Sequence, residues 1–299
     1  MPHDGWHPHD HLHHHAHERP TRRLVLAAAT FLPFGGASAQ GADAQQRIAE
    51  QANRFLALLD DRQRGHVLIA FDTANRLDWH YIPRSRSGLS LGEMTPAQAD
   101  AARALFATVL NEQGLKLLDG VRLLEGVLRE QQGSWRDPSR YYLSVFGTPG
   151  RFPWGWRFEG HHLSLNVALP APGHVAVTPF FVGAHPATVR EGPNKGFRLL
   201  GGAEDLARQI MTGLNDSQRR TALIANRSFG EIVASPQREQ DLGQPRGLEL
   251  GAMDGPTRQR VEAPTTSIRY GATLRPTSAT TPWPSTIVAS RIADGRSPS

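Results

Sequence analysis

The pattern of apolar and polar residues changes along this chain from helical spacing to strand-like alternation. Between residues 43 and 59, apolar side chains recur every three or four positions, which predicts a helix with one buried face. Two capping-box pairs predict the starts of further helices: Asp60 with Gln63, and Thr95 with Gln98. Helical spacing then continues over residues 115–128 and ends near Gly133. The first part of the folded chain is therefore predicted to be helical.

After Pro138 the apolar positions alternate with a period of two, which predicts β-strands. Three segments have this pattern: residues 141–146, 156–169 and 174–181. The turn residues 170–173 favour an antiparallel hairpin between the second and the third. A shorter strand is predicted over residues 79–82, and helical spacing returns over 203–212 and 215–225. The predicted fold class is α+β, with amino-terminal helices packed on a mainly antiparallel sheet and further helices after it.

Residues 1–39 have the organisation of an export signal. Arg22 and Arg23 precede an apolar run over residues 24–32, and Ala37-Ser38-Ala39 supplies a small-residue cleavage site before Gln40. The paired arginines are typical of a twin-arginine signal, although the general export route also accepts them. A histidine-rich stretch lies ahead of this signal and would be removed with it. We therefore expect an exported protein, periplasmic or extracellular, without stable membrane insertion once the signal is removed.

Two segments follow the predicted cleavage site. Residues 40–254 are expected to form a single α+β domain. Residues 255–299 contain many prolines, serines and threonines and only two acidic residues, Glu262 and Asp294. Such a composition buries too little apolar surface to offset chain entropy, which predicts a low-complexity, disordered tail.

Composition limits the chemistry that the chain can perform. The formal net charge is +5 and the pI is about 10.2, but the arginines are scattered singly rather than gathered in a stripe. We therefore expect no nucleic-acid partner. The chain has no cysteine, which excludes thiol nucleophiles, disulfides and cysteine-ligated metals. A metal site would have to use histidine, carboxylate or backbone oxygen.

The candidate catalytic residues are His161 and His162, in the segment predicted as one strand from 156 to 169. Successive strand residues point to opposite faces, so we expect His161 at the apolar face and His162 beside Ser164 and Asn166. A bulge at Gly160 would bring Trp156 to the apolar face. One imidazole would then act as ligand or general base in a cleft lined by aromatic residues.

A divalent metal is a further open interpretation of this region. Two histidines on opposite faces cannot chelate one ion, so Glu159, His174, His185 or another residue would have to join one of them. The candidate ligand-binding residues are Trp156, Glu159, Asn166 and His185. The opposing interpretation is that the imidazoles bond to neighbouring backbone or to Asn166 and only stabilise the sheet.

Two segments of the chain carry a family resemblance. Residues 154–166, which include Gly160-His161-His162, and residues 178–186, which include Gly183-Ala184-His185-Pro186, resemble the bacterial family catalogued as Domain of Unknown Function 3500. The resemblance extends from about Phe55 to Met253. It implies an α+β protein, commonly exported, and carries no activity.

This chain departs from the family pattern near its carboxy-terminal end. Members of the family resemble one another through another helix and a further strand-rich section, whereas this chain changes after Asp254 into the proline-, serine- and threonine-rich segment. The hypothesis is a truncated or frame-shifted copy.

Two function classes follow. The first is an exported ligand- or metal-binding protein or enzyme with its site around Gly160–Asn166, taking a small-molecule ligand. The second is a non-catalytic envelope or extracellular protein with structural histidines. No dinucleotide fingerprint, Walker loop, H-E-x-x-H or EF-hand spacing is present in the sequence.

Overall fold

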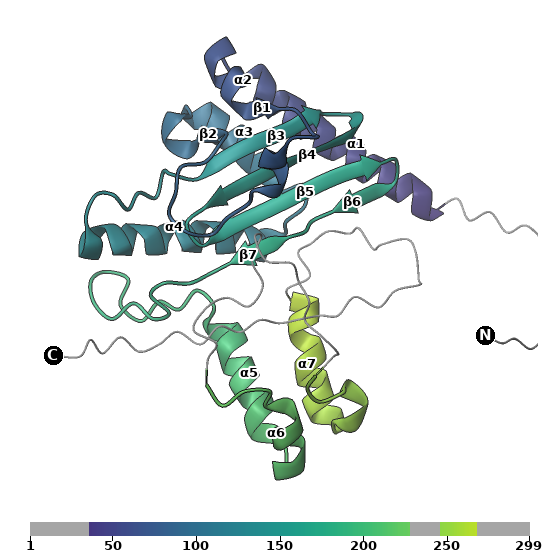
Figure 1. Cartoon of the computed structure of the whole chain (residues 1–299), viewed down its shortest axis with the longest axis vertical. Helices are drawn as coiled ribbons and strands as arrows, with labels where there is room; N and C mark the ends of the chain where they lie inside the picture. The colour runs from purple at the N-terminus through teal and green to yellow at the C-terminus, as the bar shows by residue number, and fades with distance from the viewer. Residues whose placement is uncertain (1–35, 228–245, 268–299) are drawn as a thin grey trace, which may run out of the picture. The chain divides into compact units, whose positions relative to one another are not determined.

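The longer helices and strands follow the predicted order of helices, then strands, then helices, with two short strands among the first helices. A computed structural model describes residues 36–227 and 246–267 (Figure 1). The helices are α1 (Gly36–Ala57), α2 (Asp61–Val67), α3 (Pro96–Phe106), α4 (Glu112–Gln132), α5 (Gly201–Gly213), α6 (Asp216–Ala222) and α7 (Gly255–Ser267), with short 3-10 helices η1 (Ala74–Leu77), η2 (Leu91–Glu93) and η3 (Leu250–Ala252). The strands are β1 (Leu68–Ile69), β2 (Leu89–Ser90), β3 (Tyr142–Thr148), β4 (Arg151–Gly160), β5 (Leu163–Ala171), β6 (His174–Ala176) and β7 (Phe180–Val182).

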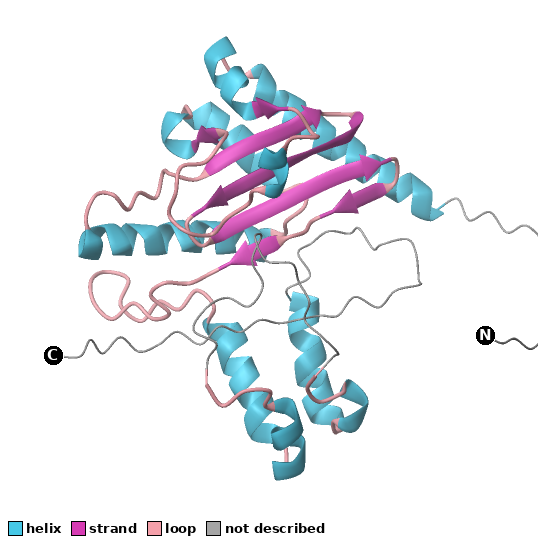
Figure 2. Ribbon diagram, viewed as in Figure 1, coloured by secondary structure: helices cyan, strands magenta, loops and turns pink. Residues whose placement is uncertain are grey.

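The strands form one mixed sheet in the order β1-β3-β4-β5-β6, with β2 paired on β3 and β7 paired on β5 (Figure 2). Only the short β1–β3 pairing is parallel; the other pairings of the described strands are antiparallel. This confirms the α+β class and the mainly antiparallel sheet.

The strand predicted over residues 156–169 is in fact two strands. β4 ends at Gly160, β5 begins at Leu163, and these two residues pair across a two-residue turn formed by His161 and His162. The predicted bulge at Gly160 is therefore wrong, because the chain reverses there. Glycine is needed at this position, since an added Cβ would lie 2.3 Å from Cδ1 of Tyr141.

Two other strand predictions also differ from the structure. The segment 174–181 divides into β6 and β7, which both pair with β5. The strand predicted over 79–82 is a loop, and its backbone contacts side chains and the histidine turn rather than a neighbouring strand.

One face of the sheet is apolar and packs on helices. Phe106 of α3 has its ring centroid 5.7 Å from that of Trp156 and 4.4 Å from that of Phe158, both on β4. Both strand residues are almost fully buried. α1 in turn packs against α3. Burial of this face at about 25 cal/mol per Å² of apolar surface drives the helices onto the sheet.

The other face carries a polar row, because residues directly opposite in an antiparallel pair share a face. Arg157 lies opposite Ser144 on one side and Asn166 on the other, and Glu159 lies opposite Ser164. The loop that contains η1 crosses in front of these strands, while α1 and α3 lie behind them (Figure 1). The polar face is therefore covered by a loop rather than by a helix.

The predicted helix starts are confirmed in detail. The side chains of Asp60 and Thr95 each accept a hydrogen bond from the N3 backbone N–H, and the side-chain oxygens of Gln63 and Gln98 accept one from the backbone N–H of the capping residue. These two glutamines also exchange hydrogen bonds with each other, at 2.8 and 3.2 Å, so the capping residues join α2 to α3.

The carboxy-terminal helices are partly as predicted. α5 and α6 match the expected segments, and Asn215 with Gln218 forms a capping box. α7, however, lies within the segment expected to be disordered. Its start is capped by Asp254, whose Oδ1 accepts a hydrogen bond from the Thr257 backbone at 2.8 Å, and Thr257 is buried. Local capping and contact with α5 therefore outweigh composition over 255–267. Residues 268–299 of the predicted tail lie outside the described residues.

The predicted export signal lies mostly outside the described residues too. α1 begins at Gly36, so cleavage before Gln40 would leave the helix from Gln40 to Ala57, which includes its buried residues Ile48 and Phe55. Among the helices of the described ranges, none combines the length and apolarity that crossing a membrane requires.

Candidate functional site

The histidine turn, His161–His162, is held by backbone contacts from three parts of the chain. The His162 N–H donates to the carbonyl of Tyr81 at 2.8 Å, and the Gly183 N–H donates to the carbonyl of His162 at 2.8 Å. The buried Tyr141 hydroxyl donates to the carbonyl of His161 at 3.0 Å. Burial raises the pKa of Tyr141 well above its usual value, so this hydroxyl keeps its proton. The turn is therefore fixed in place.

His161 is fully partnered and lies between an acid and a base. Its Nδ1 is 2.6 Å from Oε2 of Glu125 on α4. Because a carboxylate can only accept, Nδ1 carries the proton, while Nη1 of Arg136 lies 3.1 Å from Nδ1 and 3.3 Å from Nε2. The same Nη1 is 3.8 Å from Oε1 of Glu125. All three side chains are buried, so they satisfy one another away from water.

His162 is different, because neither of its ring nitrogens is hydrogen-bonded to a described residue. Its ring stacks on His161, with centroids 3.9 Å apart. Burial, together with the neighbouring His161, His185 and Arg136, lowers the pKa of His162 to about 3. At neutral pH His162 is therefore a neutral imidazole with an unused lone pair.

The backbone of His162 is strained as well. Its φ is 57°, the left-handed region that bulky residues rarely adopt, and His162 is the one non-glycine residue of the described chain with a positive φ. Gly183 makes the conformation fit, since a Cβ there would lie 3.0 Å from Cγ of His162. Strain of this kind is concentrated at functional sites.

His185 completes the group. Its ring centroid is 6.2 Å from that of His162, in an edge-to-face arrangement, and burial also lowers its pKa. The rings line a histidine crevice together with apolar side chains of α4 and Gly183; its residues are Val121, Leu124, Glu125, His161, His162, Gly183 and His185. The crevice is too narrow to hold a water molecule unless a wall moves.

The remaining predicted ligand residues do not join this crevice. Trp156 is buried in the core against Phe106, so the expected aromatic cleft does not exist. Asn166 donates to Oγ of Ser164 at 3.0 Å and to the carbonyl of Pro179 at 2.8 Å, which ties β5 to the start of β7. Both residues therefore have structural partners.

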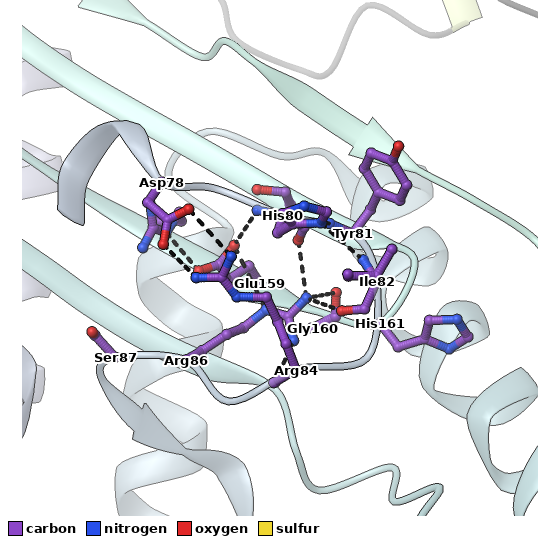
Figure 3. A network of polar contacts seen from close by, with 12 residues as sticks. Asp78, His80, Tyr81, Ile82, Arg84, Arg86, Ser87, Glu159, Gly160 and His161 are labelled. Atoms are coloured by element: carbon purple, nitrogen blue, oxygen red, sulfur yellow. Dashed lines mark hydrogen bonds and ion pairs between the residues drawn. The ribbon is translucent and has the colours of Figure 1, made fainter. Parts of the chain in front are cut away.

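Glu159 lies on the polar face of the sheet and not beside His161. Its Oε1 is 2.9 Å from Nε of Arg157, as an ion pair, and its Oε2 accepts from the His80 backbone at 3.0 Å. Figure 3 shows this network, with the ring of His161 directed away from it. Glu159 and the histidine turn therefore belong to two separate places.

Sequence reasoning missed Glu125 and Arg136. A signal for Glu125 was present, since it lies four residues after Val121 and three before Leu128, on the buried stripe of α4. A carboxylate on an apolar helix stripe requires a buried partner. Arg136 follows the helix in an irregular segment and gives no such signal.

The described residues contain no cluster of side chains suited to binding a metal ion. Within 36–227 and 246–267, no group of three or more histidine, aspartate or glutamate side chains is arranged to hold a metal ion. The carboxylate nearest to the histidines, Glu125, is already paired with His161 and Arg136.

The two segments that carry the family resemblance meet at this site. β7 pairs with β5, Gly183 bonds to His162, and His185 faces His162. A family model described as "Protein of unknown function (DUF3500)" matches residues 41–281. No curated protein and no solved structure matches the chain.

Proposed function

Since the chain belongs to the DUF3500 family, whose description names no activity, we propose from the site itself that it is an exported protein that binds a small molecule at the histidine crevice. In this proposal His162 accepts a hydrogen bond from an O–H or N–H group of the ligand. His185 forms the opposite wall.

The observation that carries the proposal is that the ring of His162 is neutral and has no hydrogen-bond partner among the described residues. Its backbone, in addition, adopts a left-handed conformation that is uncommon for a residue with a side chain. A purely structural residue at this turn would be better served by glycine or asparagine, which adopt this backbone conformation readily. A ligand that donates to the imidazole supplies the missing partner.

His161 has a different role in the proposal. Glu125 and Arg136 both contact its ring, which fixes that ring and, through stacking, the ring of His162. His161 is thus a positioning residue rather than the reacting group.

Ligand entry requires a wall of the crevice to move. The segment between β7 and α5 has no helix or strand. It packs on Leu124 and Val127 of α4 through Val189, with partly buried Ala184, Phe197 and Leu199 beside it, in a cluster smaller than the main core. Such a small apolar contact is easier to open than the main core. We therefore place the entrance at this segment.

A reactive probe tests the availability of His162. Diethyl pyrocarbonate acylates unprotonated imidazole nitrogens, so His162 should be modified at a rate that does not change between pH 7 and pH 5, whereas a histidine of pKa about 6.5 reacts more slowly as it is protonated. Peptide mass spectrometry locates the adduct, with exposed His174 as a check on the reagent. Absence of modification at His162 would contradict the proposal.

A ligand screen tests binding itself. Small hydroxyl- and amide-containing molecules are added to the protein, and the melting temperature is recorded. A true ligand raises it in the unaltered protein and in His174→Asn, and has no effect in His162→Asn. Ligands that act equally on all three proteins bind elsewhere.

Export is tested separately. In the proposal, the mature protein begins at Gln40 and lies outside the cytoplasm, and replacement of Arg22 and Arg23 by lysine blocks its export if the route is the twin-arginine one. Amino-terminal sequencing of the fractionated protein gives the answer.

The second candidate is a non-catalytic envelope or extracellular protein, favoured by the closed Glu125–His161–Arg136 group. It predicts that the His161→Ala and His162→Ala variants are both less stable than the unaltered protein, and that neither substitution changes the binding of any ligand. Metal analysis of the two variants accompanies this comparison.

A further inference from the structure

A cleft opens on the polar face of the sheet, apart from the histidine crevice. It lies between β4 and the loop from Asn75 to Ser87, and its volume is about 300 Å³. Every residue that lines it is polar or charged. Its size is at the lower end of the range for small-molecule sites.

The cleft has an excess of positive charge. Arg84, Arg86 and Arg157 line it, against Asp78 and Glu159. The side chains of Arg86 and Arg157 are only 2% exposed, and that of Glu159 is 3% exposed. The buried carboxylate of Glu159 is therefore paired with two buried guanidinium groups: its oxygens lie 2.9 Å from Nε of Arg157 and 3.7 Å from Nε of Arg86.

Most of the guanidinium hydrogens are used to hold the loop. Nη2 of Arg86 donates to the carbonyls of His80, Ile82 and Gly160 (Figure 3). Nη1 of Arg157 donates to the carbonyl of Asn75. These contacts fix both guanidinium groups in the wall of the cleft before any ligand arrives. Preorganisation of this kind lowers the cost of binding.

The two Nε groups are the exception. Neither Nε of Arg86 nor Nε of Arg157 makes an aligned hydrogen bond to any residue that the structure describes, although both are buried. The 2.9 Å approach of Arg157 to Glu159 is an ion pair without that alignment. A buried donor without an aligned acceptor is unfavourable, so the positive charge of these two groups is incompletely compensated, and an oxyanion in the cleft would be attracted to it.

An exposed ion pair lies at the mouth of the cleft. Arg84 donates to Asp78 through both Nη atoms, the Nη1–Oδ1 distance being 3.2 Å, and their side chains are 35% and 43% exposed. Such a pair contributes little to stability. Arg84 can therefore exchange Asp78 for an incoming anion at small cost.

From these observations we propose that the cleft between β4 and the Asn75–Ser87 loop is a binding site for a small oxyanion, the carboxylate or phosphate group of a polar metabolite, with Arg84 as the mobile cation and Arg86 and Arg157 as the fixed ones. The inference is independent of the proposed function. His161 is directed toward Glu125 on α4, whereas Arg157 and Glu159 face the loop.

Isothermal titration with sodium phosphate and sodium succinate, against sodium chloride at equal ionic strength, tests the site on the full chain. Phosphate or succinate should bind, and chloride should not. Arg84→Ala should weaken binding about tenfold, the worth of one charge-assisted hydrogen bond. Asp78→Asn should strengthen binding, because it removes the competitor of the anion.

Arg103→Ala is the matched control. Arg103 pairs with Asp119 at 2.9 Å, with both side chains about as exposed as Arg84 and Asp78, but on α3 and α4. Its loss should leave anion affinity unchanged. The proposal is overturned if neither anion binds the unaltered protein, or if Arg103→Ala weakens binding as much as Arg84→Ala does. It is also overturned if Asp78→Asn weakens binding while circular dichroism shows an intact fold.

Discussion

The imidazole rings of His161 and His162 stack with their centroids 3.9 Å apart, although the two residues are neighbours in the chain. Neighbouring strand residues point to opposite faces, so this contact requires the chain to reverse between them. The positive φ of His162 and the missing Cβ of Gly183 allow that reversal. The turn therefore places His161, whose ring contacts Glu125 and Arg136, beside His162, whose ring nitrogens have no hydrogen-bond partner among the described residues.

The strain at His162 can be measured with two variants that both remove the imidazole. His162→Gly should have a free energy of unfolding about 1 kcal/mol larger than His162→Ala, because glycine adopts the left-handed region without steric cost. Urea titration of the two proteins gives the difference. Equal stability of the two variants would mean that the backbone at residue 162 is not strained.

The depressed pKa of His162 predicts a loss of stability in acid. Below pH 6.5 the unfolded chain binds a proton at residue 162 that the folded protein does not bind until about pH 3. As the pH is lowered from 6.5 toward 3, the free energy of unfolding should therefore decrease, by at most about 1.4 kcal/mol per pH unit from this residue. Urea titrations at pH 7, 5.5 and 4.5 should show a shallower fall in His162→Asn, and parallel curves for the two proteins would refute the prediction.

Glu125→Gln should destabilise the protein by about 3 kcal/mol, because it leaves the buried Arg136 without its carboxylate. The matched control on the same helix is Glu112→Gln, which removes an exposed pair with Lys116 and should change little. A double variant, Glu125→Gln with Arg136→Gln, should lose less than the sum of the single losses. Thermal and urea unfolding measure all of these variants, and additive losses would show that the two side chains are not coupled.

Gly160→Ala should destabilise the protein by about 3 kcal/mol, since its Cβ would lie 2.3 Å from the ring of Tyr141, which is itself held by its bond to His161. Gly65→Ala in α2 is the control, because nothing lies within 4 Å of its added Cβ. That change should stabilise the protein by up to about 1 kcal/mol. A Gly160→Ala protein as stable as the unaltered one would mean that Tyr141 is free to shift.

The sequence alone could predict the elements whose signals are local. Asp60 with Gln63 and Thr95 with Gln98 mark helix starts because capping uses only residues three apart. Period-two alternation also relates Arg157 to Glu159, because residues two apart on a strand share a face, where these two side chains form an ion pair. The fold class rests on these same patterns.

The tertiary structure decided the site, because its contacts join residues far apart in the chain. Glu125 meets His161 from a helix that precedes the sheet, and His185 reaches His162 from beyond β7. No spacing rule relates such positions. The reversal at His161–His162 depends likewise on Tyr81, Tyr141 and Gly183, which hold the turn from outside. Local hydrogen bonding therefore determined the elements, whereas packing between distant segments determined which imidazole contacts Glu125 and Arg136 and which has no hydrogen-bond partner among the described residues.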